Sequence, residues 1–332
     1  MPPLLDVQNL RVYYHTNHGP VKAVDGVSFR IEARERYGLI GESGSGKSTI
    51  ALSLMRMIKP PGRIESGHIS LDGVKVLERS EEQMRQIRLA QIALVTQGAM
   101  NSLNPVIRIK IQIADGLRNH SVRMNGQALD DFIAGLLSRV GLRPEVANLY
   151  PHQLSGGMKQ RVCIAIAVSL RPKLIIADEP TSALDVVVQR RVMETLRRVQ
   201  EELGASVILI GHDMGLMAQF TDRVGVMYAG RLVEEGKVGE LFSKPQHPYT
   251  QLLMSSLPTL EEKGIFQLAR GAPPSLLDLP TGCVFHPRCP YKMERCTVEE
   301  PILQTTWSGH QAACHLLDNG QVEAEAQEER ES

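Results

Sequence analysis

The chain lacks any apolar run long enough to cross a membrane as a helix. The longest runs, such as residues 162–168, are far shorter than the ~20 residues that a membrane helix requires. The first six residues contain neither a basic region nor a signal-like apolar core. We therefore expect a soluble, cytosolic protein that reaches any membrane it serves through a partner.

An excess of charge of one sign is also lacking. Lysine and arginine together number 37, as do aspartate and glutamate, in a chain of 332 residues. Without a global basic field, nothing in the composition favours a polyanion, and we expect no nucleic acid partner. The length leaves room for about two domains.

A glycine-rich segment, GESGSGKST at residues 41–49, matches the phosphate-binding loop G-x-x-x-x-G-K-[ST] at every fixed position. It follows an apolar strand at 37–40 and precedes a helix expected at about 47–58. Glycines let backbone N–H groups close around phosphate oxygens, and the helix N-terminus favours the same anion. Lys47 is expected to reach the β- and γ-phosphates of ATP, and Ser48 to ligate Mg²⁺. The other expected nucleotide contacts of this loop are Gly41, Ser43, Gly44, Gly46 and Thr49.

Two adjacent carboxylates end a second apolar strand, LIIADE at residues 174–179. Alone, such a pair is usually a solvated turn, but a phosphate-binding loop precedes it here. Asp178 is expected to hold Mg²⁺ through water. Glu179 is expected to lie beside the γ-phosphate and polarise the attacking water, which is what phosphoryl transfer requires of the protein.

A second glycine-rich element, LSGGMKQ at residues 154–160, lies roughly a hundred residues after the loop and also opens a helix. Packing by small residues would explain its glycines but not the whole string. With the two motifs above, it makes the chain resemble the nucleotide-binding subunit of an ATP-binding-cassette (ABC) transporter. In that family Ser155, Gly156 and Gly157 of one subunit would complete the site on the partner's loop, so that hydrolysis requires dimer closure.

The resemblance implies roles for four further positions. Gln97 matches the glutamine that reaches the Mg²⁺ and the attacking water, and His212 matches the switch histidine at the γ-phosphate. Asp185, in the string SALD at residues 182–185, belongs to the loop that crosses the dimer interface. Tyr14 is the candidate for stacking on adenine, with Tyr13 as the alternative.

Strand and helix patterns alternate in the way typical of a doubly wound α/β fold, here a P-loop NTPase of the ABC type. Alternation over residues 4–14 and 21–31, with Gly19-Pro20 in the turn, predicts an N-terminal antiparallel β subdomain. A helical pattern predicts an α-helical signature subdomain at about 100–170, and residues 225–233 predict a closing hairpin.

Three domain-level segments are expected. The ABC ATP-binding domain would cover residues 1–243. A Pro-rich and then Cys-rich extension would cover 244–317. The acidic, polar stretch at 318–332 is most simply a disordered tail.

The extension is similar to that of dipeptide and oligopeptide importer ATPases, on the strings QHPYTQLL at 246–253 and GCVFHPRCP at 282–290. The string NSLNP at 101–105 also suits that group, whereas GAM at 98–100 departs from many relatives. The resemblance implies a heterodimer with a second related ATPase, two transmembrane permeases and an extracytoplasmic solute-binding protein. The chain would lie at the cytoplasmic face of the inner membrane, touching it only through the permeases. The alternative is a stand-alone or differently partnered soluble ABC ATPase that takes no part in transport.

Four of the five cysteines, Cys283, Cys289, Cys296 and Cys314, fall within about thirty residues, whereas Cys163 lies in the signature helix. A cytosolic chain seldom keeps disulfides, so the cluster suggests a metal. The spacing lacks the C-x2-C knuckles usual for zinc. Chemistry alone leaves zinc and iron–sulfur about equally open, with reduced thiols as a third option; the resemblance favours a 4Fe–4S cluster. If the metal is Zn²⁺, His286, His310 and His315 could substitute as ligands.

Overall fold

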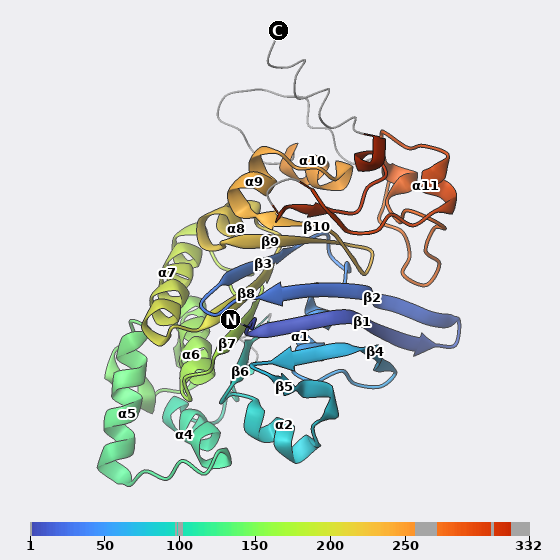
Figure 1. The fold of residues 1–332 in the computed structure, drawn as a ribbon. Helices are drawn as coiled ribbons and strands as arrows, with labels where there is room; N and C mark the ends of the chain where they lie inside the picture. Colours follow the sequence, from blue (N-terminus) through green and yellow to red (C-terminus); the bar gives the residue numbers. More distant parts are fainter. Residues whose placement is uncertain (1, 97, 99–101, 256–270, 307–308, 320–332) are drawn as a thin grey trace.

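The computed structural model describes residues 2–96, 98, 102–255, 271–306 and 309–319. It contains two β-sheets, with helices distributed around the larger one (Figure 1). Among the described residues no helix is both long and apolar enough to cross a bilayer.

The smaller sheet is antiparallel and has the strand order β2-β1-β4-β5. Its strands are β1 (Leu5–Thr16), β2 (Gly19–Ile31), β4 (Gly62–Leu71) and β5 (Val74–Lys75). The predicted N-terminal β subdomain is therefore confirmed. The predicted turn position was wrong, because Thr16 pairs with Gly19 and the turn is the two-residue loop Asn17-His18. Gly19 and Pro20 already belong to β2, and the Thr16 hydroxyl donates to the Gly19 carbonyl at 2.9 Å.

The larger sheet has eight strands in the order β11-β12-β10-β9-β3-β8-β7-β6. Its parallel strands are β3 (Arg36–Ile40), β6 (Ile92–Val95), β7 (Leu174–Asp178), β8 (Ser206–Gly211) and β9 (Arg223–Tyr228). β10 (Arg231–Lys237) runs antiparallel to β9 and forms the predicted hairpin with it. Parallel strands bring their carboxyl ends to one edge of the sheet, where the loops that follow β3, β7 and β8 meet.

Both faces of this sheet are covered, as the predicted α/β fold requires. Along β7, Leu174 and Ile176 belong to one apolar cluster, together with Ile50 of α1. Ile175 and Ala177 belong to the other, together with residues of the helices on the opposite face. The helices are α1 (Lys47–Leu54), α2 (Glu81–Ile87), α4 (Ile109–Asn119), α5 (Gly126–Arg139), α6 (Gly156–Val168), α7 (Val186–Leu203), α8 (Met214–Phe220), α9 (Val238–Ser243), α10 (Pro248–Ser255) and α11 (Arg295–Val298).

Helix α1 is shorter than predicted and ends at Leu54 rather than at about residue 58. Arg56 adopts a left-handed conformation with φ 48°. The N–H of Met57 then donates to the Leu52 carbonyl at 2.8 Å. Such a backward hydrogen bond after a left-handed residue terminates a helix.

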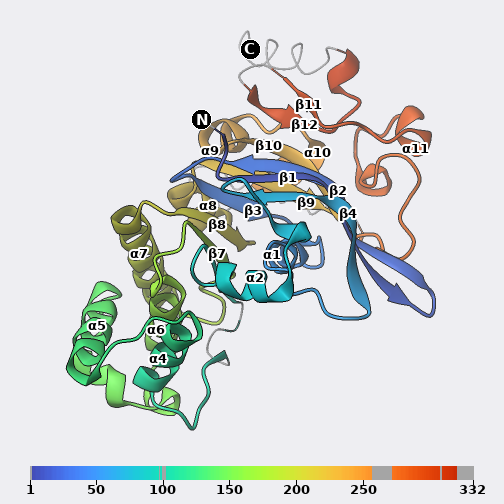
Figure 2. The same ribbon diagram turned by 60° about the horizontal axis from the view of Figure 1, so that its bottom comes forward.

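Helices α4, α5 and α6 form the predicted helical segment between β6 and β7. In both views it projects away from the antiparallel sheet and from the C-terminal part of the chain (Figures 1 and 2). The short 3₁₀ helices Pro144–Asn148 and Pro151–Gln153 lead from α5 to α6. The signature motif is therefore carried on a protruding part of the molecule.

The C-terminal extension returns to the larger sheet. β12 (Gln311–Ala312) pairs with β10, and β11 (Gln304–Thr305) pairs with β12. The predicted boundary at residue 244 lies between α9 and α10. Asp318, within the predicted tail, lies in a 3₁₀ turn and its carboxylate accepts from Arg295 at 2.7 Å; residues 320–332 lie outside the described part of the chain.

Candidate nucleotide site

The phosphate-binding loop connects the carboxyl end of β3 to α1, as the sequence predicts. Gly41 has φ 148° and Gly46 has φ 103°. A Cβ on Gly41 would lie 2.1 Å from the Met227 carbonyl oxygen, and one on Gly46 would lie 2.1 Å from that of Ala23. Only glycine fits at both positions, because the backbones of β9 and β2 pass so close. Ser43 and Gly44, at the top of the loop, are exposed, and Thr49 is half-buried.

The Lys47 ammonium lies inside this loop. It donates to the carbonyl oxygens of Gly41 and Glu42, each at 2.8 Å, and to the Ser45 hydroxyl at 3.2 Å. Burial lowers the pKa of Lys47, and the nearby charges of Glu179 and Asp178 counteract that effect. The cation is therefore held where phosphate oxygens can replace carbonyl oxygens as its acceptors.

The predicted magnesium ligands lie together at the end of β7. The Ser48 hydroxyl donates to Asp178 Oδ1 at 3.2 Å. Burial raises the pKa of Asp178, and the neighbouring charge of Glu179 raises it further. A hydroxyl and a carboxylate are the hard oxygen ligands that Mg²⁺ prefers, and the ion would compensate this buried negative charge. These two residues fit the metal; the third predicted ligand, Gln97, lies outside the described residues.

Glu179 and His212 meet across the neighbouring strand ends. His212 Nδ1 lies 3.4 Å from Glu179 Oε1, and 72% of the His212 side chain is exposed. The Glu179 backbone has φ 44°, and its N–H donates to the Ile210 carbonyl at 2.9 Å. Both residues line a cavity of about 200 Å³ that also borders the segment containing Ser182. A carboxylate and an imidazole thus line one cavity at the ends of β7 and β8.

The signature motif begins α6, as predicted. Ser155 is exposed and caps the helix, its Oγ accepting from the Met158 N–H at 3.4 Å. Gly157 is buried, and a Cβ there would lie 2.3 Å from Val188 Cγ1 of α7. Asp185 in turn caps α7 by accepting from the Val188 N–H at 3.0 Å. The signature helix and the predicted interface loop are therefore packed together as one unit.

That unit is separate from the phosphate-binding loop of the same chain. Helix α6 packs on α4, α5, α7 and β6, whereas α1 packs on β2 and β7. In both views α6 lies among the protruding helices and α1 beside the antiparallel sheet (Figures 1 and 2). The half-buried Gly156 and the exposed Ser155 thus remain open to a second molecule.

The two candidate adenine-stacking tyrosines differ in their surroundings. The Tyr13 hydroxyl donates to Asp25 Oδ1 at 2.7 Å, and burial together with that contact raises the pKa of Tyr13 to about 12. Tyr14 is half-buried, with its ring against Gly62 on β4. Tyr13 is therefore engaged in a polar contact, and the stacking role of Tyr14 stays a prediction.

Residues of the extension also reach the phosphate-binding loop, which sequence reasoning missed. The Arg288 guanidinium makes two hydrogen bonds to the Glu42 carboxylate, at 2.9 and 3.0 Å. The Glu42 N–H donates to the Tyr249 hydroxyl at 2.9 Å. Both partners lie inside the strings HPRCP and QHPYT, but nothing local in those strings indicates what they contact.

The four clustered cysteines line one small cavity of about 10 Å³, with His247, His286 and His315 among the other lining residues. Burial raises the pKa of Cys283, that of Cys289 to about 11 and that of Cys314 to about 12. Among the described residues, no group of three or more potential ligands is close enough to hold a single metal ion. His310 does not line this cavity, because its Nε2 lies 2.7 Å from the buried Glu234 Oε1.

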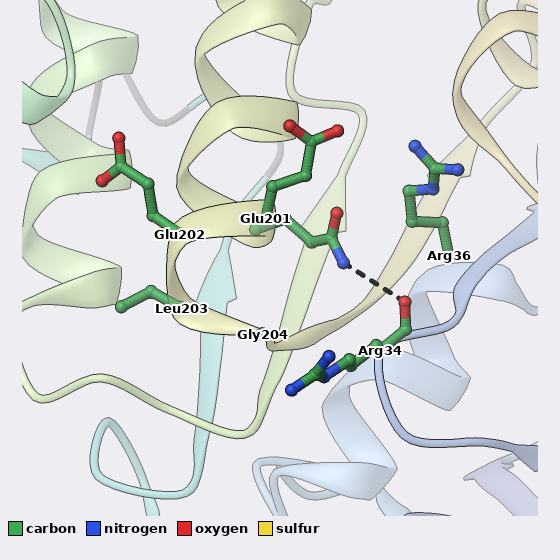
Figure 3. A pocket seen from close by; sticks show the side chains of 7 residues that line it. Arg34, Arg36, Glu201, Glu202, Leu203 and Gly204 are labelled. Atoms are coloured by element: carbon green, nitrogen blue, oxygen red, sulfur yellow. Dashed lines mark hydrogen bonds between the residues drawn. The ribbon is translucent and has the colours of Figure 1, made fainter.

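Another hollow, of about 440 Å³, lies at the opposite edge of the sheet (Figure 3). It includes Arg36, the first residue of β3, so it is at the amino ends of the parallel strands. Arg36 is paired with Asp222 at 2.7 Å, and the Arg34 carbonyl accepts from the Gln200 amide at 3.2 Å. Because Arg36 is already paired and Glu201 and Glu202 add negative charge to its wall, this hollow suits a triphosphate less well than the loop does.

Comparison with known proteins agrees with this geometry. Residues 24–182 match the family model described as ABC transporter, and residues 233–296 match the model described as oligopeptide/dipeptide transporter, C-terminal region. The dipeptide transport ATP-binding protein DppD of Haemophilus influenzae is 43% identical, over 96% of this chain and 97% of its own. The oligopeptide transport ATP-binding protein AppD of Bacillus subtilis is 41% identical, over 96% and 98%.

A solved structure supports the fold. The dimeric post-hydrolysis state of the ATP-binding cassette MJ0796, bound to ADP and Pi, superposes with a TM-score of 0.63 and 28% identity, covering 70% of this chain and 98% of that one. The cassette likeness and the nearly full-length match to peptide-transport relatives coincide with the loop, the strand-end carboxylates and the signature helix described above. The chain therefore belongs to the ATP-binding proteins of the dipeptide/oligopeptide ABC transporter family.

Proposed function

We propose that this chain binds and hydrolyses ATP to power the import of dipeptides or oligopeptides through partner permeases. The observation that carries the proposal is the convergence of three groups at one edge of the parallel sheet: the Lys47 loop, the Ser48–Asp178 pair and the Glu179–His212 pair. The extension that matches the oligopeptide/dipeptide transporter model adds the substrate class. Sequence relatives named for peptide transport, matched over nearly the whole chain, support the same conclusion.

The residues divide the work of hydrolysis. Lys47 exchanges its carbonyl acceptors for phosphate oxygens when ATP binds. Bound Mg²⁺ supplies positive charge at the β- and γ-phosphates, and Ser48 and Asp178 would hold it. Glu179 polarises the attacking water and accepts its proton, while His212 is placed to donate to the γ-phosphate. Positioning and charge stabilisation account for most of the catalysis, because phosphoryl transfer needs little covalent chemistry from the protein.

The site needs a second subunit for completion. Ser155 is exposed at the start of α6, a helix that packs on α4, α5, α7 and β6 rather than on the chain's own loop. Val186 and Val187, directly after Asp185, are 79% and 62% exposed. Two large apolar side chains beside a predicted interface loop are expected where a partner covers them. We infer a heterodimer with a second related ATPase, in which each signature motif contacts the nucleotide on the other subunit.

The remaining partners follow from the family. Two transmembrane permeases would receive the conformational change, and an extracytoplasmic solute-binding protein would deliver the peptide. The chain would then lie at the cytoplasmic face of the inner membrane, held there by the permeases. Val106, 77% exposed before α4, lies on the protruding part of the molecule and is available for such a contact.

Affinity purification tests this assembly. The tagged chain, extracted from membranes in mild detergent, should bring down two polytopic permeases and a second ATPase. Reconstituted with a peptide-loaded binding protein, the complex should take up labelled peptide in proportion to ATP hydrolysed. A Glu179→Gln complex is the matched control and should assemble without uptake. Recovery of an active ATPase with no permease would instead support a stand-alone enzyme.

We further propose that Cys283, Cys289, Cys296 and Cys314 hold a 4Fe–4S cluster. The four thiols line one cavity in a chain expected to be reduced, a setting in which clustered cysteines favour a metal over a disulfide. A single Zn²⁺ needs all ligands at about 2.3 Å from one point, and the described residues offer no such group. In a cluster each thiolate binds a different iron, so wider spacing is acceptable. When bound, the cluster would cross-link the extension; the present cavity would have to widen to admit it.

Anaerobic purification tests the cluster. The protein should be brown, with absorption near ~400 nm and about four irons per chain. Cys289→Ala should lose the iron, whereas Cys163→Ala, in the signature helix, should keep it. If the protein is colourless and contains one zinc per chain, the four cysteines form a zinc site and not an iron–sulfur site. If the protein contains no metal and all four thiols react freely, the cysteines form no metal site.

A further inference from the structure

The second residue of the phosphate-binding loop, Glu42, is held by the C-terminal extension. Arg288 lies on the 3₁₀ helix His286–Arg288 and reaches Glu42 with both terminal nitrogens, at 2.9 and 3.0 Å. Its side chain is only 7% exposed. A buried, two-pronged arginine–carboxylate pair is among the strongest polar contacts that side chains make.

The backbone of Glu42 is fixed at the same time. Its N–H donates to the Tyr249 hydroxyl at 2.9 Å, and its carbonyl accepts from Lys47 Nζ at 2.8 Å. Glu42 therefore makes three contacts: its carbonyl accepts from Lys47, its N–H donates to Tyr249 of α10, and its carboxylate accepts from Arg288. Two parts of the extension thus determine the position of one loop residue.

Arg288 is itself rigidly placed. Its Nη1 donates to the Tyr228 hydroxyl at 3.1 Å, and its guanidinium carbon lies 5.7 Å from the Tyr228 ring centre. The Tyr228 ring packs on Tyr249 at 4.6 Å and on Phe285 at 5.2 Å. Since Tyr228 ends β9, this cluster fastens the extension to the sheet beside the loop.

The negative charge of Glu42 explains why its pairing with Arg288 is important for nucleotide binding. An uncompensated carboxylate within the loop would repel the triphosphate of ATP. We propose that Arg288 is a positioning residue for ATP binding: it compensates the charge of the Glu42 carboxylate, which would otherwise repel the triphosphate at this loop. The inference rests on the proposed binding of ATP at this loop.

The test is ATP affinity of the full-length chain, measured by titration with a fluorescent ATP analogue. Arg288→Ala leaves the Glu42 carboxylate without its compensating cation and should weaken binding about tenfold or more, equivalent to about 1.4 kcal/mol. Arg288→Ala combined with Glu42→Gln restores neutrality and should recover most of that loss. Glu42→Gln alone removes the negative charge, leaves the Arg288 cation beside the loop, and should bind ATP more tightly than the wild type; this outcome does not depend on whether Arg288→Ala folds.

Varying the ionic strength distinguishes an electrostatic effect of Arg288→Ala from a loss of packing. The Arg288→Ala deficit should shrink as salt rises from about 0.05 to about 0.5 M, because salt screens the repulsion. Lys292→Ala, which removes an exposed cation from the same extension, should bind ATP like the wild type. Lys47→Ala should bind poorly in every background.

Wild-type affinity in Arg288→Ala would overturn the inference, as would a loss that Glu42→Gln does not recover or that salt does not change. A several-fold weakening by Glu42→Gln alone would contradict it as well. If the wild type has no ATP affinity, or if Lys47→Ala leaves it unchanged, the proposed function itself fails. These outcomes are distinguishable because each is read from a different variant.

Discussion

Glu179 combines a half-buried strand-end position with a left-handed backbone, φ 44°, that few non-glycine residues adopt. The hydrogen bond from its N–H to the Ile210 carbonyl holds that conformation across two strands. In this conformation its carboxylate lies 3.4 Å from the His212 imidazole, which follows β8. Strained backbone of this kind concentrates at functional sites, where the surrounding structure fixes it.

Glu179→Gln should retain ATP binding while reducing turnover by at least about a hundredfold, since the amide keeps the shape but cannot accept a proton. The measurement is steady-state hydrolysis by the assembled complex with the partner's site also disabled. Nucleotide trapping in the closed dimer serves as the control for binding. Near-normal hydrolysis would contradict the assignment of Glu179 as the catalytic carboxylate.

Lys47→Ala should weaken nucleotide binding itself, by about tenfold or more, because it removes the buried cation from the phosphate cradle. Equilibrium titration of the isolated chain with an ATP analogue measures this directly. The midpoint of thermal unfolding without nucleotide serves as the control for folding. Unchanged affinity would mean that the triphosphate binds elsewhere.

At the scale of secondary-structure elements, the loops after β3, β7 and β8 carry the chemistry, and α6 with α7 carries the expected interface. Ser155 and Asp185 each cap a helix, so both residues have a local structural role besides their predicted role in the dimer. Gly157 allows the two helices to touch at their first turns. The interface loop and the signature are therefore held in one packed unit.

Ser155→Arg should leave ATP binding at the chain's own loop largely intact but prevent closure over the partner's nucleotide. The bulky cation would occupy the space in front of α6, where the partner's phosphates are expected. Dimer formation by a hydrolysis-deficient pair, followed by size-exclusion chromatography with ATP, measures closure. Ser155→Asn, which preserves the helix cap, is the matched control. Collapse of ATP affinity in the isolated chain would show that the signature acts within one subunit.

Asp222→Asn should lower the free energy of unfolding by about 1 kcal/mol at neutral pH. Asp222, just before β9, accepts from the Arg36 N–H at 2.9 Å and from its guanidinium at 2.7 Å. Although burial opposes it, bonding to Arg36 lowers the pKa of Asp222 below its ordinary value of 3.8. A lowered acid pKa stabilises the fold above the ordinary value, and the contribution is lost as pH falls through the folded-state pKa.

Urea unfolding of both proteins at a series of pH values measures this effect. The difference between wild type and Asp222→Asn should be constant from about pH 5 to 8 and should shrink below about pH 4. If the difference in unfolding free energy persists unchanged in acid, the contribution of Asp222 comes from packing and neutral hydrogen bonding rather than from its charge.

At the scale of the whole molecule, the extension and the helical segment lie at opposite ends of the central sheet, the extension beside β10 and the helical segment beside β6 (Figures 1 and 2). The extension is joined to the sheet by buried polar contacts as well as by β12. Glu234 on β10 is fully buried and accepts from the Gln246 N–H at 2.7 Å, the His247 N–H at 3.0 Å and His310 Nε2 at 2.7 Å. One carboxylate thus fastens two distant parts of the extension.

Glu234→Ala should release the extension, because it leaves three buried donors without an acceptor, at a cost of about 3 kcal/mol or more. Limited proteolysis should then cleave beyond residue 244 much faster than in the wild type, while the N-terminal part stays intact. Glu240→Ala, on the neighbouring α9 and partly exposed, is the control and should not change the cleavage pattern. Equal protection of both variants would show that other contacts suffice to hold the extension.

Much of the nucleotide site could be predicted from the sequence because its parts are local. A strand, a glycine loop and a helix N-terminus together make a phosphate cradle, so the positions of Gly46, Lys47 and Ser48 followed from one string. The carboxylates at the end of β7 and the start of α6 could be predicted from short strings in the same way. Local patterns were less reliable at boundaries, where single left-handed residues such as Arg56 decided the helix end.

What the sequence determined was therefore the fold class and the family, and it predicted the residues expected around ATP, because each depends on short strings with fixed backbone requirements. Only the tertiary structure decided that Arg288 pairs with Glu42, 246 residues away, that Tyr249 holds the loop amide, and that β12 extends the sheet. The physical reason is that these contacts arise where separately formed surfaces pack together. Their geometry depends on the placement of whole elements, which no local pattern encodes.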